Sequence, residues 1–492
     1  MKNLRFKRTL RGDISSSGDG PRRFRCDACL RIDTSFDVLW GLPIPNGWRG
    51  GRSDSPPAIS LGMDTMESRL FADVCSPQRL YSAWRYLRKG ARVSQWDHIL
   101  REYHAIEFDP LGFVNKLSER LKSGNFAFDL KLGYTKRKSG GSRRGIVVAS
   151  ISDRMVQRSI LTSITEPSDE TQDLVRTLHS VVFSHTSMAG APGKSVGEAV
   201  YLAHQTMKGG ATHFLCSDVK SFYPHIPRKR ISETVRSHIK DSKFCNLFEK
   251  AITTSLSNEH EMKPWIDLFP LQEKGVPQGS SLSVFCANVA LSGIDTELNT
   301  ERLTTIRYLD DILILGKSKT EVDLAFGRVL EILRADGMDA YLPRDGSQKA
   351  WSGRVESGVD FLGCRVNSRN ISPSRRANRA LLDEIEFEVS RSKRAISNLK
   401  GHDQFVEGFP KECSVGATLA RTSASAEGWS EAYKFCSNRL PFHQLQKEID
   451  KIQRDYLGWS IRFSSRFHAK QWRQVWGGAN IASVIPRRPI AL

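Results

Sequence analysis

The sequence lacks an apolar run close to the ~20 residues that a transmembrane helix requires, and its first residues are too polar for a signal peptide. Its nine cysteines are scattered singly, apart from Cys26 and Cys29. Cys216, Cys286 and Cys364 lie in apolar segments, which is typical of small core residues. This cysteine usage excludes a disulfide-rich secreted scaffold and favours a cytoplasmic protein without a membrane partner.

The pair Cys26 and Cys29 has the spacing of half a zinc site. A structural zinc ion needs four ligands. No second cysteine pair lies nearby, and the first histidine is His98. A zinc site would therefore require two ligands from distant parts of the chain, and none is expected.

Acidic residues are outnumbered. The 492-residue chain has 73 Lys and Arg against 54 Asp and Glu, a formal net charge of +19. The basic residues are spread along the whole chain, as expected for a protein that holds a phosphate backbone in a long channel. Charge alone also allows a merely soluble basic protein.

The most informative feature is YLDD at residues 308–311, inside the apolar run IRYLDDILIL. Two adjacent carboxylates in a strand-like segment lose hydration and repel each other. Such a pair normally persists where a cation lies between carboxylates. An acidic hairpin turn is the alternative, because Asp is common in turns.

A second acidic position lies in HFLCSDVKSFYPHI, which predicts a short buried strand that ends at Asp218 before Pro224. Mg²⁺ is commonly held by one or two carboxylates together with substrate phosphates. An Asp at a strand end that faces an Asp-Asp hairpin suits two ions roughly 3.5–4 Å apart. We therefore expect two Mg²⁺ ions at Asp218, Asp310 and Asp311. Strand alternation favours Asp310 as the closer ligand.

The third motif, GVPQGSSLSVFCANVAL, predicts a glycine-containing loop and then a helix capped by Ser280 or Ser281. Its small side chains would let the backbone and the Gln278 amide approach a planar ligand. By itself, the pattern also fits an ordinary loop before a core helix.

Taken in order, these motifs resemble the palm of a reverse transcriptase. GVPQGSSLS matches the Pro-Gln-Gly motif, YLDD the Tyr-x-Asp-Asp motif, and Asp218 lies in the first palm motif. FLG at 361–363 matches the primer-grip hairpin, and KSGGSRRGIVVASISDRMVQRSIL is similar to the fingers signature of bacterial members. The resemblance implies an α+β right-hand polymerase with fingers, a palm with an antiparallel sheet, a helical thumb and an N-terminal extension.

The resemblance also implies roles for single residues in an RNA-directed DNA polymerase. Asp218 and Asp310 match the metal ligands, with Asp311 beside them. Tyr223 matches the bulky residue that blocks a ribose 2′-hydroxyl and so favours dNTPs; its alternative role is a core aromatic beneath the sheet. Gln278 matches the residue that lies against the incoming nucleotide.

In the fingers segment, Arg144 matches the arginine of a Gly-Lys-x-Arg-Pro pattern that grips the triphosphate, a role suited to guanidinium. The sequence departs from the pattern because Ser142 replaces the lysine. Lys138 or Arg143 is expected to supply the missing charge.

The segment DRMVQRSILTSI predicts an amphipathic helix with Ser152 as its N-cap. Arg154 and Arg158 share one face of this helix. They would contact the template strand or form a solvated face.

Four regions are expected along the chain: a flexible basic tail (1–62), an N-terminal helical extension (63–125), fingers and palm (126–372), and a helical thumb with the C-terminal region (373–492). The last region also has room for an RNA platform or a homo-oligomer interface.

In this last region, basic side chains should face the duplex; they include Arg391, Lys393 and Arg394. The tryptophans should lie in the core, or one should stack on a base; they are Trp459, Trp472 and Trp476.

The subgroup follows by elimination. The sequence shows no RNase H pattern, no maturase or His-Asn-His nuclease motif, and neither the Asn-Ala-x-x-His nor the Val-Thr-Gly motif of retron enzymes. What remains resembles the stand-alone bacterial reverse transcriptases of the "unknown groups", many of which act in antiphage defence. A structured non-coding RNA is then the expected template, with dNTPs as substrates and DNA as product. A retron-type enzyme that makes RNA-linked DNA and a catalytically silent RNA-binding module are the alternatives.

Overall fold

A computed structural model describes residues 68–137, 141–270, 273–344, 349–399, 409–465 and 467–478. The tail at 1–62, Cys26, Cys29 and Lys138 lie outside the described residues. Within these ranges, no helix is both long and apolar enough to cross a membrane.

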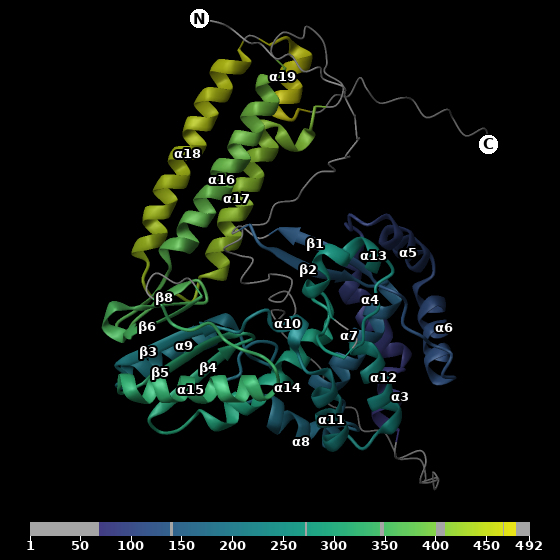
Figure 1. The fold of residues 1–492 in the computed structure, drawn as a ribbon. Helices are drawn as coiled ribbons and strands as arrows, with labels where there is room; N and C mark the ends of the chain where they lie inside the picture. The colour runs from purple at the N-terminus through teal and green to yellow at the C-terminus, as the bar shows by residue number, and fades with distance from the viewer. Residues whose placement is uncertain are drawn as a thin grey trace, which may run out of the picture.

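The described chain begins with four helices: α3 (Arg69–Val74), α4 (Pro77–Ala91), α5 (Asp97–Phe108) and α6 (Pro110–Lys122). Proline occupies the first turn of α4 and α6, and the preceding Ser76 and Asp109 side chains cap both helices. These helices form the outer wall of the molecule on the side away from the central sheet (Figure 1).

The fingers consist of an antiparallel hairpin and a group of helices. The hairpin pairs β1 (Leu132–Arg137) with β2 (Arg143–Val148). The helices are α7 (Ile151–Thr165), α8 (Gln172–Val182), α11 (Arg228–His238), α12 (Ser242–Ile252), α13 (Glu259–Met262) and the 3₁₀ helix η1 (Lys263–Leu268).

The prediction that Ser152 caps helix α7 is wrong. The helix begins at Ile151, and its cap is Ser150, whose side chain accepts a hydrogen bond from the Asp153 N–H. Ser150 has the extended backbone that lets an N-cap side chain turn back onto the first helical turn. Ser152 instead donates its hydroxyl to Glu102 on α5, at 2.9 Å.

The palm is a four-stranded antiparallel sheet in the order β4-β5-β3-β6. Its strands are β3 (His213–Asp218), β4 (Leu303–Tyr308), β5 (Asp311–Gly316) and β6 (Ala350–Arg354). Its helices are α9 (Val196–Lys208), α10 (Phe222–His225), α14 (Leu282–Glu297) and α15 (Lys319–Ala335).

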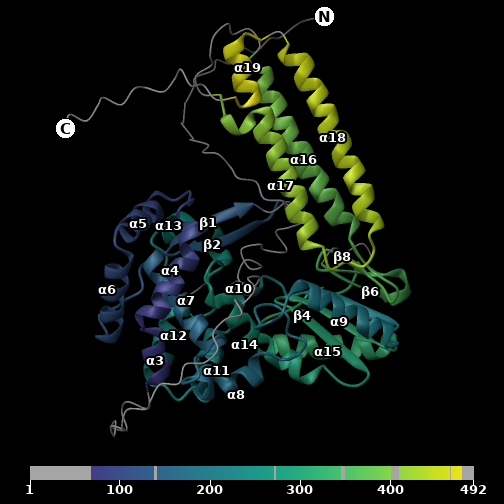
Figure 2. The same ribbon diagram turned by 180° about the vertical axis from the view of Figure 1, so that it is seen from behind.

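Apolar side chains leave both faces of this sheet, because successive strand residues point in opposite directions. Leu215 and Ile314 join the core beneath α14 and α15, whereas Phe214 and Leu315 join a second core with α9. The sheet is therefore buried between helices on both sides (Figures 1 and 2).

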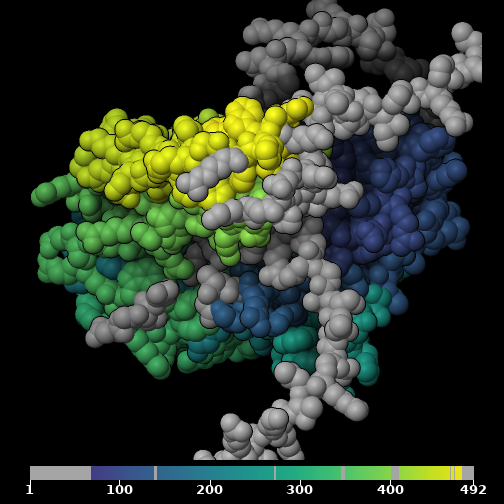
Figure 3. Space-filling view, turned by 90° about the horizontal axis from the view of Figure 1, so that it is seen from above, coloured from purple at the N-terminus to yellow at the C-terminus, as the bar shows by residue number. Residues whose placement is uncertain are grey.

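The thumb follows a small antiparallel sheet of β7 (Val359–Phe361), β8 (Cys364–Val366) and β9 (Ile371–Pro373), which comes after the 3₁₀ helix η2 (Val355–Ser357). Its helices are α16 (Arg375–Ser397), α17 (Val415–Ala432), α18 (Leu440–Ser464) and α19 (Ala469–Trp476), with the 3₁₀ helix η3 (Lys411–Cys413) before α17. Viewed from above, the thumb helices and the N-terminal helices lie on opposite sides of the molecule (Figure 3). The mixture of helices and antiparallel sheets confirms the predicted α+β class.

The tryptophans predicted for the thumb have different environments. Trp459 stacks between Tyr456 and Phe463, with ring centroids 6.4 and 4.9 Å away. Trp476 donates its indole N–H to Ser464. Trp472 is 48% exposed, so it is the one not enclosed in the core.

The basic residues of α16 also differ. Arg394 is exposed, and the Lys393 ammonium lies 5.6 Å from the Trp459 ring centre. Arg391 is partly buried and forms an ion pair with Glu388, so of these three side chains Arg394 is the most accessible to a ligand.

Candidate active site

Three carboxylates lie where β3 ends beside the start of β5. Asp218 is the register partner of Asp311 across the antiparallel pair, so both side chains leave the same face of the sheet. Asp310 lies in the two-residue turn between β4 and β5, and its carboxyl group is close enough to those of Asp218 and Asp311 to interact electrostatically with both. The Val219 N–H donates to the Asp310 carbonyl at 3.1 Å and fixes the turn against β3.

The carboxylates are electrostatically costly in this arrangement. Burial, and then the neighbouring Asp218 and Asp311 carboxylates, raise the pKa of Asp310 well above its usual value. The Lys349 ammonium forms an ion pair with Asp218 and supplies one positive charge to the group. A cation between Asp218 and Asp310 would relieve the same repulsion.

The donor set suits a hard divalent ion. Carboxylate oxygens are the ligands that Mg²⁺ prefers, and Mg²⁺ usually takes only one or two carboxylates, completing its shell with water and substrate phosphates. In the part of the chain that the structure describes, no three His, Cys, Asp or Glu side chains form a complete metal cage. Asp218 and Asp310 alone therefore form only a partial donor set for such an ion.

Two lysines beside this site were missed by the sequence reasoning. The Lys220 ammonium pairs with Asp339 at 2.6 Å. The Tyr341 ring centre lies 5.8 Å from the Lys220 ammonium and 5.5 Å from that of Lys349. A lysine two residues after the first palm aspartate and another just before β6 were the available signals.

Tyr223 lies on α10, directly after the end of β3. It is partly buried, packs against the main core, and its ring centroid is 5.6 Å from that of Phe222. Its carbonyl accepts a hydrogen bond from the Val276 N–H at 3.0 Å, which ties the Pro-Gln-Gly loop to α10. The core role of this tyrosine and a role at the nucleotide site are compatible.

Gln278 lies where the Pro-Gln-Gly loop meets the fingers. Its backbone carbonyl accepts from the Val147 N–H of β2 at 3.0 Å. Its side-chain Oε1 is buried and has no hydrogen-bond partner among the described residues. Ser280, rather than Ser281, hydrogen-bonds to the first turn of α14, by accepting from the Leu282 N–H.

The fingers hairpin carries two like-charged pairs directly across its strands. Lys136 faces Arg144, and Arg137 faces Arg143. Like charges at opposed positions destabilise a hairpin. Such pairs favour an anionic ligand, and Lys136 is a candidate that the sequence reasoning missed.

The two predicted arginines of this hairpin point to opposite faces. Arg143 lies with its guanidinium 4.7 Å from the Trp265 ring centre and donates to Thr135 Oγ1 at 2.7 Å. Arg144 is exposed on the other face, together with Lys136. The structure thus groups Lys136 and Arg144 and separates Arg143 from them.

Neither expectation for Arg158 fits the structure. Arg158 is 6% exposed, and its guanidinium lies 4.2 Å from the ring centre of Tyr86 on α4. Burial lowers the pKa of both Arg154 and Arg158. Arg158 therefore fastens the N-terminal helices to α7 and contacts neither template nor bulk solvent.

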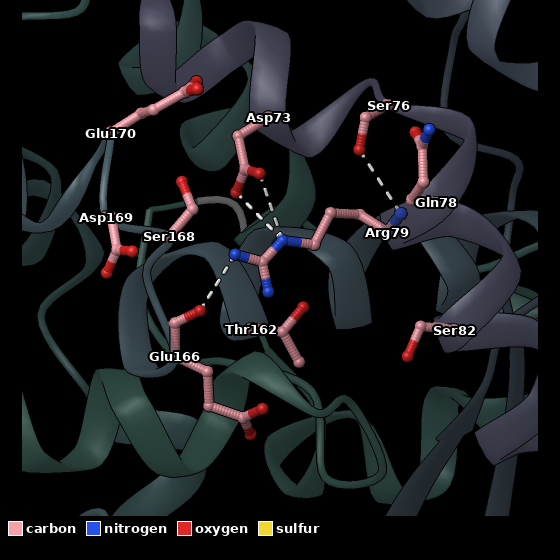
Figure 4. Close-up of a pocket in the computed structure, with 10 residues that line it drawn as sticks. All are labelled: Asp73, Ser76, Gln78, Arg79, Ser82, Thr162, Glu166, Ser168, Asp169 and Glu170. Atoms are coloured by element: carbon pink, nitrogen blue, oxygen red, sulfur yellow. Dashed lines mark hydrogen bonds and ion pairs between the residues drawn. The ribbon is translucent and has the colours of Figure 1, made fainter. Parts of the chain in front are cut away.

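A hollow of about 650 Å³ lies between the N-terminal helices and the segment after α7 (Figure 4). Arg79 crosses it, pairing with Asp73 at 3.0 Å and donating to the Glu166 carbonyl at 2.9 Å. Its lining residues include none from the palm motifs. The contacts of Arg79 give this hollow a structural function.

The region that contains the candidate active site is similar to a known protein family. Residues 136–366, which contain all the predicted site residues, match the family model "Reverse transcriptase (RNA-dependent DNA polymerase)". The chain contains a reverse transcriptase domain. The predicted reverse transcriptase fold is thereby confirmed.

Curated relatives share parts of this domain. The "Uncharacterized 91 kDa protein in cob intron" of Schizosaccharomyces pombe is 28% identical over 185 residues, which are 37% of this chain and 20% of that protein. The "Group II intron-encoded protein LtrA" of Lactococcus lactis is 25% identical over 244 residues, 47% of this chain and 35% of that protein. The chain thus matches about a fifth to a third of the length of these relatives.

Among solved structures, apo telomerase of Candida tropicalis aligns with 54% of this chain and 60% of its own length, at 14% identity and a TM-score of 0.36.

Proposed function

We propose that this chain is an RNA-directed DNA polymerase that extends a primer with dNTPs. One observation carries the proposal: within a reverse transcriptase domain, Asp218 faces Asp311 in register, and the Val219 N–H holds the turn of Asp310 against the end of β3. Nucleotidyl transfer with two metal ions uses carboxylates from neighbouring segments, and this arrangement supports the proposal.

Asp218 and Asp310 would hold two Mg²⁺ ions, with Asp311 adjoining them. When bound, these ions supply activation of the primer 3′-hydroxyl and neutralisation of the triphosphate. The protein's own task is to position the reactants, and the turn and β3 that carry the aspartates are fixed to each other by backbone hydrogen bonds.

The fingers would bind the triphosphate through Lys136 and Arg144, whose mutual repulsion an anion relieves. Arg143 and Lys138 would add charge nearby. Tyr223 would exclude a ribose 2′-hydroxyl, and the Gln278 amide would lie against the nucleotide. The docking of the Gln278 backbone onto β2 supports this role, because it joins the loop to the fingers.

The template is proposed to be a structured non-coding RNA and the product its cDNA, made in the cytoplasm by a stand-alone bacterial enzyme of antiphage defence. The net charge of +19 supports nucleic-acid binding of this kind. The thumb helices provide the surface for the duplex and for a second copy of the chain.

An intron-encoded enzyme that copies its own intron RNA is the second candidate. It is favoured by one observation: the two curated relatives described above are named as proteins of introns. The two candidate enzymes catalyse the same reaction and differ in the RNA that the protein binds.

The test is to purify the chain from a bacterial host with its native flanking DNA, supply Mg²⁺ and dNTPs, and sequence the bound RNA and the new DNA. The control is the double variant Asp310→Ala/Asp311→Ala. DNA complementary to one enriched small RNA, absent from the control, is expected. A spliced or unspliced intron as that RNA would select the second candidate, and a 2′–5′ branch in the product would identify a retron-type enzyme. RNA bound by both proteins without DNA from either would overturn the polymerase proposal.

A further inference from the structure

Arg307 is a fully buried arginine beneath the turn that carries Asp310. It is the penultimate residue of β4, and its exposed fraction is 0%. Its partner Asp295, on α14, is buried as well, with 1% of its side chain exposed. An ion pair removed from water in this way requires hydrogen bonds for every charged atom, or the desolvation cost exceeds the gain.

All five N–H groups of the Arg307 guanidinium have acceptors. Nε donates to Asp295 at 2.9 Å, and Nη2 donates to the other Asp295 oxygen and to Ser187 Oγ. Nη1 donates to Asn288 Oδ1 at 3.0 Å and to the carbonyl of Leu309 at 3.3 Å. The bond to Leu309 ties the guanidinium to the turn that carries Asp310.

Leu309 adopts a left-handed backbone, with φ of 55°. A non-glycine residue keeps this conformation only where its surroundings fix it. The Leu309 carbonyl is fixed by Arg307, and the next carbonyl, that of Asp310, by the Val219 N–H. The peptide groups on both sides of Asp310 are thus held, which sets the direction of its carboxylate toward Asp218.

The same guanidinium connects the turn to α14, the helix that follows the Pro-Gln-Gly loop. Asn288 and Asp295 both belong to α14, which begins directly after the Pro-Gln-Gly loop. The segment before α9 joins them, since the guanidinium donates to Ser187 Oγ at 2.7 Å and the Arg307 backbone bonds to Thr186 and Met188. One side chain therefore spans three segments that meet behind the site.

We propose that Arg307 is a positioning residue: through the Leu309 carbonyl it fixes the Asp310 carboxylate at metal-binding distance from Asp218. This inference rests on the proposed function. Stability alone does not account for the residue, because well-packed apolar side chains usually replace a buried ion pair without loss of stability. Such side chains would leave the Leu309 carbonyl without its donor.

The test compares two variants of one network. Arg307→Lys keeps the positive charge beside Asp295 but loses the planar fork, so it cannot also reach Leu309. Ser187→Ala is the matched control, because it removes one partner of the same guanidinium while leaving the bond to Leu309. The variant Arg307→Met/Asp295→Leu removes the buried charges together and separates positioning from fold stability.

Two measurements are made on the full chain: Mn²⁺ binding by electron paramagnetic resonance, and hydrogen exchange of the Val219 amide that holds the turn. We expect Arg307→Lys and the Arg307/Asp295 variant to bind Mn²⁺ about 10- to 100-fold more weakly, as when a partner of a metal ligand is removed. Both should exchange the Val219 amide faster, whereas Ser187→Ala should match the wild type in both respects.

Wild-type Mn²⁺ affinity and exchange in folded Arg307→Lys would overturn the inference, as would an equal loss in Ser187→Ala. An inactive wild-type chain would instead overturn the proposed function. The exchange comparison would still decide the role of Arg307 in that case, because it requires neither metal nor polymerase activity.

Discussion

Replacing Gly279 by alanine should detach the Pro-Gln-Gly loop from the fingers. Gly279 has φ of +116°, and a Cβ there would lie 2.9 Å from the Val147 carbonyl oxygen. The backbone conformation costs a non-glycine residue about 1–3 kcal/mol. Loss of the hydrogen bond from Val147 to Gln278 adds about 0.5–1.5 kcal/mol.

Together these effects disfavour the docked loop by about 2–4 kcal/mol, which reduces the equilibrium constant for docking by about 30- to 1,000-fold. Gln278 then spends less time at the nucleotide site. We therefore expect Gly279→Ala to lower kcat/KM for dNTPs by about tenfold or more.

The assay is steady-state primer extension on an RNA template with one dNTP varied. The matched control is Gly124→Ala, where φ is also positive (+75°) but a Cβ would meet no atom within 4 Å. An unchanged kcat/KM in folded Gly279→Ala would refute the reasoning, as would an equal loss in Gly124→Ala.

Three further outcomes are expected. Removing either Lys136 or Arg144 should raise KM for dNTPs in the extension assay more than Arg143→Ala, because Arg143 is stacked on the opposite face; the reverse order would contradict the grouping. Tyr223→Ala should increase incorporation of ribonucleotides in competition assays, whereas Tyr223→Phe should not. Burial raises the pKa of Asp153 to about 6, above the ~3.9 of an unfolded chain. Its contribution to stability is therefore complete below pH ~4 and lost as the pH rises through 6. The melting temperature of the wild type should fall over this range relative to Asp153→Asn, and a constant difference would contradict the assignment.

The elements that carry the palm motifs could be predicted because their signals are local. The strand that ends at Asp218 is predicted by its apolar residues and the proline that follows them. The hairpin at 308–311 is predicted by polar residues within a strand-like run. Cap positions are less certain from sequence, since Ser150 and Ser152 both precede apolar helical residues. Only the backbone conformation, extended at Ser150, decides between them.

The roles of residues that interact with distant segments could not be predicted from local sequence patterns. The repulsion between Lys136 and Arg144 depends on the register of a hairpin. The burial of Arg158 depends on the ring of Tyr86, which is distant in the sequence. Arg307 directly precedes the YLDD motif, yet its role depends on Asp295, which lies on another element.

The central claim is that Asp218 and Asp310 together support metal-dependent DNA synthesis on RNA. The most direct measurement is single-turnover extension of a DNA primer on an RNA template, with Mg²⁺, by the wild type and Asp218→Asn. Asp323→Asn, an exposed aspartate on α15, is the control. The account predicts extension by the wild type and the control, none by Asp218→Asn, and none by any of them when Mg²⁺ is chelated. Extension by Asp218→Asn at the wild-type rate would contradict it.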